Sequence, residues 1–69
     1  MSTLVHVLEL VGESKQGFED AVKNAVEQAV RQHPGITGVE VYNFTGDVVD
    51  GRIVDFKANV KVACVHDQK

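Results

Sequence analysis

Three polar side chains with ligand-binding chemistry alternate along the last third of the chain: Lys57, Asn59 and Lys61. Residues two apart in an extended strand point to the same side, so these three predict one polar stripe. An ammonium only donates hydrogen bonds, whereas a carboxamide both donates and accepts them. The stripe is either the wall of a ligand pocket or a solvated sheet surface, and the sequence leaves both open.

Three aspartates, Asp47, Asp50 and Asp55, could gather a hard cation. The segment around them lacks the alternating Asp/Asn ligands of a calcium loop, and aspartate is common in turns. We therefore expect no metal site within one chain. A site shared between subunits at a symmetry axis is the remaining alternative.

Glu9 is the one acid inside an apolar segment near the start of the chain. Buried charges are usually paired, so we expect a basic partner across a subunit interface rather than a catalytic role. The basic residues proposed as partners are Arg52, Lys57 and Lys61.

The sequence does not predict an enzyme. The three histidines are dispersed without metal-ligand spacing, and no nucleophile–base pair or carboxylate pair stands out. The single cysteine, Cys64, alternates with apolar residues, so we expect a buried, inert thiol.

Bulk properties limit the class of protein. A chain of 69 residues is one domain, residues 1–69, near the size at which a single core barely offsets conformational entropy. Its net charge of −3 and scattered Lys and Arg argue against a nucleic-acid partner. No apolar run is long enough to span a membrane, and no signal peptide is recognisable, so we expect a soluble cytoplasmic protein.

The second half of the chain, residues 38–65, predicts a long β-hairpin. Asp50-Gly51 is a strong turn signal because glycine accepts positive φ without a Cβ clash. The second arm alternates apolar and polar side chains, which predicts one core face and one polar face. The expected core face comprises Val54, Phe56, Ala58, Val60, Val62 and Cys64, and the expected polar face also holds Asp55.

The first half predicts a strand over residues 3–11 and a helix over residues 15–32. Gly12-Glu13-Ser14 is expected to end the strand, with Ser14 as the helix N-cap, and His33-Pro34-Gly35 to end the helix. Apolar residues recur at helical spacing and predict one broad buried stripe. The stripe comprises Phe18, Ala21, Val22, Ala25, Val26, Ala29 and Val30.

These elements predict an α+β fold of strand–helix–strand–strand order, with a three-stranded antiparallel sheet partly wrapped round one helix. One helix covers only one face of the sheet. Apolar residues point to both sides of the first strand, and Ile53 and Val65 fall on the polar side of the last. This surplus predicts a homo-oligomer.

The ordered set of motifs resembles the dodecin family. The junction between the first strand and the helix matches V-x-E-x-x-G-x-S at Val7, Glu9, Gly12 and Ser14. The other matching segments are Phe18-Glu19-Asp20-Ala21-Val22, Gly38-Val39-Glu40-Val41, Val49-Asp50-Gly51 and Phe56-Lys57-Ala58-Asn59-Val60-Lys61-Val62. The resemblance implies a hollow homododecamer that stores a small-molecule ligand, a flavin such as FMN or riboflavin, in pockets between subunits.

Two departures from the flavin-binding pattern fall at the pocket positions that the resemblance assigns. A flavin-stacking tryptophan is replaced by Gly38, in a chain without any tryptophan, and a flavin-contacting glutamine is replaced by Lys57. This pattern resembles a Trp-less branch of the family. Gly38, Lys57 and the neighbouring Asn59 are the predicted ligand-binding residues. The alternative is an assembly that binds no flavin and holds ions or anionic small molecules near Lys57.

Overall fold

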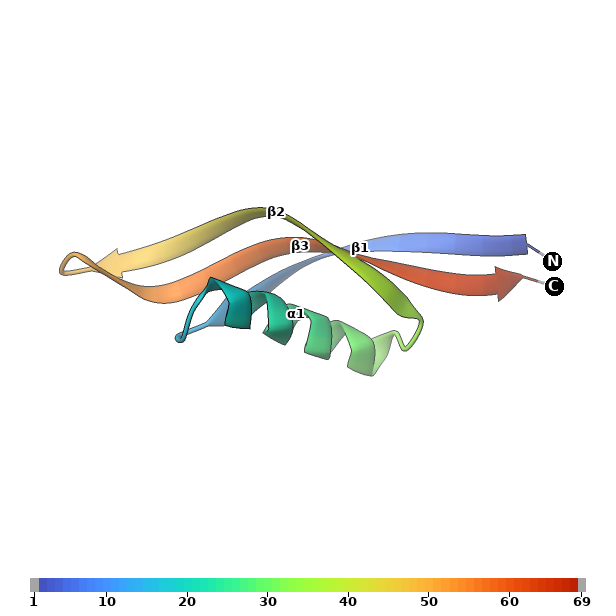
Figure 1. Ribbon diagram of the computed structural model, residues 1–69, viewed down its shortest axis with the longest axis horizontal. Helices are drawn as coiled ribbons and strands as arrows, with labels where there is room; N and C mark the ends of the chain where they lie inside the picture. The colour runs from blue at the N-terminus through green and yellow to red at the C-terminus, as the bar shows by residue number, and fades with distance from the viewer. Residues whose placement is uncertain (1, 69) are drawn as a thin grey trace.

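The computed structural model describes the backbone of residues 2–68 and the side chains of residues 5–65. Its elements are β1 (Ser2–Ser14), α1 (Phe18–Gln32), β2 (Ile36–Val49) and β3 (Arg52–Gln68). The three strands form one antiparallel sheet of order β1-β3-β2, with α1 packed against one face (Figure 1). The predicted α+β fold is confirmed, and β3, the most regularly alternating segment, is the central strand.

The core lies between α1 and the middle of the sheet. Three alanines at four-residue spacing form the buried line of the helix, where their small side chains let it approach the strands closely. Alternate residues of β3 complete the core, as the sequence predicted. The buried apolar residues are Ala21, Ala25, Ala29, Ala58, Val60, Val62 and Cys64.

The first strand was predicted to end at Val11, but it continues to Ser14. Gly12, Glu13 and Ser14 keep their pairing with β3, opposite Ala58, Lys57 and Phe56. Gly12 is not a strand breaker but the point where α1 crosses the strand. A Cβ there would lie 2.0 Å from the Ala21 carbonyl oxygen and 2.7 Å from the Ala25 Cβ.

The prediction that Ser14 caps the helix is wrong. The helix begins at Phe18, its N-cap position is Gly17, and no side chain caps it there. Ser14 instead secures the turn before the helix: Gln16 N donates to Ser14 Oγ (2.8 Å), which donates to Asp20 Oδ2 (2.7 Å). Residues 15–17, which the sequence predicted to be helical, instead form the connection from the sheet to the helix.

The turn between β2 and β3 confirms the hairpin signal. Asp50 and Gly51 both have positive φ, 53° and 77°. Two successive positive values match the twist of the flanking strands, and this is why Asp-Gly is favoured there.

The molecule is elongated, 55 × 19 × 13 Å, because the sheet extends past the helix at both ends. The β2–β3 turn lies at one end and the chain termini at the other (Figure 1). Val54, predicted in the core, is 42 % exposed because its arm of the hairpin lies beyond α1. Other large apolar side chains are exposed too: Val5, Val7, Val11, Val30, Val39, Tyr42, Phe44, Val48, Val49 and Ile53.

Candidate functional site

The predicted polar stripe lies on the sheet face opposite α1. Lys57, Asn59 and Lys61 alternate with the buried Ala58, Val60 and Val62, which face the helix. Each stripe residue has cross-strand neighbours on both sides, since β3 is central. The pairs are Glu13, Lys57 and Thr45; Val11, Asn59 and Asn43; and Glu9, Lys61 and Glu40.

Asn59 and Lys61 both have partners within the chain. Asn59 Nδ2 donates a hydrogen bond to Asn43 Oδ1, and Lys61 Nζ lies 5.5 Å from the centre of the Tyr42 ring. Lys61 Nζ is also 3.9 Å from Glu9 Oε1. The expected partner of Glu9 is thus found, but inside the chain and at a Glu9 side chain that is 67 % exposed, not at a buried interface.

Lys57 is clamped between two aspartates. Its Nζ donates to Asp47 Oδ2 at 3.0 Å and lies 3.5 Å from Asp55 Oδ2. The hydrogen bond that Lys57 donates to Asp47 is the main cause that raises the pKa of Lys57. The lysine therefore stays charged, but two carboxylates already offset its charge, which weakens its predicted role as an anion-binding group.

Asp55 lies on the polar face, as the alternation predicts, yet it is only 7 % exposed. The strand register shifts between Asp47 and Val48, and Asp55 pairs with Asp47 beside the long side chain of Lys57. Alternation predicts the face on which a residue lies, but not the cover that neighbouring side chains give it.

Gly38 lies at the start of a shallow groove of about 230 Å³. A register shift separates it from Ile36, and nothing lies within 4 Å of the position that its Cβ would take. This geometry is compatible with an irregular strand start at Gly38 and with an open pocket. The groove is lined by Val7, Gly38, Val39, Glu40, Lys61, Val62 and Ala63.

The structure does not bring Gly38 and Lys57 together in one chain. Gly38 pairs with Ala63, six residues along β3 from Lys57, which is a separation of about 20 Å at the rise of a strand. Lys57 and Asn59 are neighbours on one face. A single pocket that uses both Gly38 and Lys57 would need two chains.

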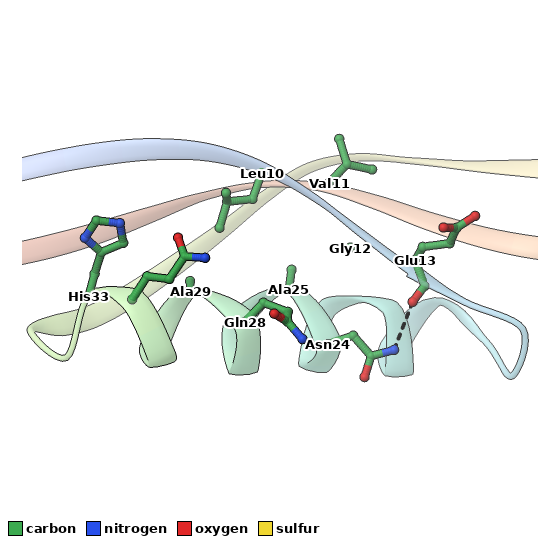
Figure 2. A pocket seen from close by; sticks show the side chains of 10 residues that line it. Leu10, Val11, Gly12, Glu13, Asn24, Ala25, Gln28, Ala29 and His33 are labelled. Atoms are coloured by element: carbon green, nitrogen blue, oxygen red, sulfur yellow. Dashed lines mark hydrogen bonds between the residues drawn. The ribbon is translucent and has the colours of Figure 1, made fainter.

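A second groove, of about 390 Å³, runs between α1 and β1 (Figure 2). Leu10, Ala25 and Ala29 give it an apolar floor, and Gln28 lies at its rim. Asn24 Nδ2 donates to the Glu13 carbonyl oxygen (2.9 Å) and ties the helix to the strand end. This groove was not predicted from the sequence. Its one signal in the sequence is Gly12, because the close contact with α1 requires a glycine there.

Among the residues whose side chains are described, no three His, Cys, Asp or Glu residues are grouped so that they could hold a metal ion. Asp47 and Asp55 converge on Lys57 instead of on a vacant position. Within residues 2–68, no helix is long and apolar enough to cross a membrane.

The fold and the site define a small α+β protein with one helix on a three-stranded antiparallel sheet and open grooves on its surface. The sequence profile of the Dodecin family matches residues 4–67. The chain belongs to the dodecin family.

Solved structures agree with this assignment. The dodecin from Streptomyces davaonensis is 25 % identical, with a TM-score of 0.90 over 99 % of this chain and 100 % of that one. The dodecin from Streptomyces coelicolor is 27 % identical, with a TM-score of 0.89 over 97 % and 96 %. A point variant of the Thermus thermophilus dodecin, 21 % identical, shares the fold at a TM-score of 0.90 over 97 % and 100 %. No curated protein matches the chain.

Proposed function

We propose that this protein is a non-enzymatic small-ligand binding and storage protein that acts as a hollow homododecamer. The observation that carries the proposal is the separation of about 20 Å between Gly38 and Lys57, the two family pocket positions. A ligand that touches both positions must lie between subunits. One chain therefore supplies only part of the proposed site.

The exposed surface supports assembly. The chain has 4966 Å² of accessible surface, whereas a folded monomer of 7.5 kDa is expected to have about 4,200 Å². Much of the exposed apolar area lies on the arms beyond α1 and on the β1 side opposite the helix, including Val7, Val11, Val48 and Ile53. A second copy is the natural cover for such arms in a chain this small.

The proposed ligand is of flavin type, such as FMN or riboflavin, as membership of the family suggests. A second candidate function is an assembly that binds no flavin and holds ions or other anionic small molecules. One observation favours the second: position 38 offers no ring for stacking, in a chain without tryptophan.

Assembly is tested by light scattering coupled to size exclusion. We expect a mass of ~90 kDa, twelve copies of a 7.5 kDa chain, with no folded monomer on dilution. Burial of the exposed arms is the physical reason, since the apolar side chains on them have no cover within one chain. A compact, stable monomer across the concentration range would overturn the proposed assembly.

The ligand is tested by titrating riboflavin and FMN with the protein and following flavin fluorescence. Saturable quenching at a fixed ratio per chain would support flavin storage and would require a stacking group other than residue 38. We expect weak quenching, because the chain has no tryptophan. No quenching at high protein concentration would leave the second candidate, and titrations would turn to ions and small anions.

A further inference from the structure

Two carboxyl groups meet on the face of the sheet opposite the helix. Glu13 ends β1 and pairs with Lys57, and Asp55 lies two residues before Lys57 on β3. The two acids are therefore diagonal neighbours on one face, the arrangement in which side chains of adjacent strands reach each other. The two groups are coupled: Asp55 raises the pKa of Glu13, and Glu13 lowers the pKa of Asp55.

One carboxylate oxygen of Asp55 has no hydrogen-bond donor among the described residues. Its Oδ2 lies 3.5 Å from Lys57 Nζ, but its Oδ1 is buried and receives no hydrogen bond from the described residues. A buried acceptor without a donor is costly, and native structures seldom leave one. The side chain positioned to supply a donor is Glu13, which can donate only when it carries a proton.

We propose that Glu13 and Asp55 form a proton-binding site, in which Glu13 holds a proton and donates it in a hydrogen bond to the buried Asp55 carboxylate. Asp55 stays ionised, since it also faces the Lys57 ammonium. The pair then carries one negative charge that Lys57 matches. Loss of the proton leaves two negative charges beside each other and Asp55 Oδ1 without a donor.

The surrounding charges set the direction of the titration. The hydrogen bond with Asp55 is the largest cause that raises the pKa of Glu13, and the same bond lowers the pKa of Asp55. Lys57 and Lys15 act in the opposite sense on Glu13, by favouring its charged form. Asp47, on β2, faces the site from the other side and holds Lys57 in place.

These directions fix the pH window. Glu13 has a raised pKa, so its contribution to stability is complete below its ordinary value of 4.5 and is lost as pH rises through the raised value. Asp55 has a lowered pKa, so its contribution is present above 3.8 and is lost as pH falls through the lowered value. The shared proton therefore stabilises the folded protein in acidic solution and is released as pH rises through the raised pKa of Glu13.

The test is thermal unfolding of the assembled protein between pH 4 and 9 for the wild type, Glu13→Gln and Glu9→Gln. Glutamine is always a donor, so Glu13→Gln should match the wild type at the acid end and melt several degrees higher at the alkaline end. Glu9→Gln removes the same charge from the same strand and face and should show no such divergence. A Glu13→Gln curve parallel to the wild type across this range would overturn the proposal.

Infrared spectroscopy detects the proton directly and can be used even if thermal unfolding is irreversible. The infrared carbonyl band of a protonated carboxyl should persist in the wild type to a pH above the usual range of glutamate and be absent in Glu13→Gln. In Asp55→Asn the band should vanish at a lower pH, because the charged acceptor of the proton is gone. A band that titrates identically in the wild type and Asp55→Asn would exclude a shared proton, whatever ligand the protein binds.

Discussion

Replacing Gly12 by alanine should destabilise the protein by about 3 kcal/mol or more, since overpacking a tight contact commonly costs 1–3 kcal/mol and sometimes exceeds that. The added Cβ would lie 2.0 Å from the Ala21 carbonyl oxygen, a backbone atom in the middle of α1 that cannot move alone. The helix would have to shift off β1. That movement would disturb the contacts of Ala21 and Ala25 with the sheet.

Thermal unfolding and native mass measure this effect. The matched control is Gly17→Ala, because Gly17 has an extended backbone (φ 167°) and nothing lies within 4 Å of its Cβ position. We expect the control to melt within a degree or two of the wild type, and Gly12→Ala to melt far lower or to lose its assembly. Equal melting of the two variants would show that α1 does not need glycine at this crossing.

The double variant Gly38→Trp, Lys57→Gln should bind flavin more tightly than the wild type, by a factor of about two to ten. Aromatic stacking contributes about 0.5–1.5 kcal/mol beyond area burial, and 1.4 kcal/mol corresponds to a tenfold change in affinity. The glutamine restores a paired donor and acceptor, which an ammonium cannot offer. Position 38 has room within the chain for the larger side chain, since nothing lies within 4 Å of its Cβ position.

The single variants separate the two contributions. Gly38→Trp alone keeps the Lys57 clamp and isolates stacking, whereas Lys57→Gln alone leaves the buried Asp55 without its cation. We therefore expect Gly38→Trp to give most of the gain and Lys57→Gln to lower the melting temperature. An unchanged flavin titration in a double variant that keeps its native mass would show that the ligand pocket is not at these positions.

The local signals in the sequence were sufficient for the fold class. Alternation along β3 identified Ala58, Val60 and Val62 as core residues, because a strand sends every second side chain to the same face. Helical spacing identified Ala21 and Ala25 in the same way. The Asp50-Gly51 turn was predictable because positive φ is a property of single residues and not of their distant neighbours.

The ends of the helix and strands, and the sheet face on which residues beside a bulge lie, were less predictable. Val41 and Asn43 are opposite Val60 and Asn59, so a bulge at Tyr42 interrupts the alternation of β2. Phe44 packs its ring against Phe18 on the helix side, while Tyr42 lies beneath Lys61 on the other face. Simple alternation would have put both aromatic residues on one face, because a single extra residue reverses the side of all that follow.

By itself the sequence determined the order of the elements, the hairpin, the core residues Ala58, Val60, Val62 and Cys64 of β3, and the family. Each of these depends on local or ordered patterns. The tertiary structure alone decided that Gly12 is a contact point with α1, that Asp55 is buried and that Lys57 is held by two aspartates. It also decided that Gly38 and Lys57 lie far apart in one chain. These facts depend on which strand pairs with which, and in what register, and both are set by contacts between residues remote in the sequence.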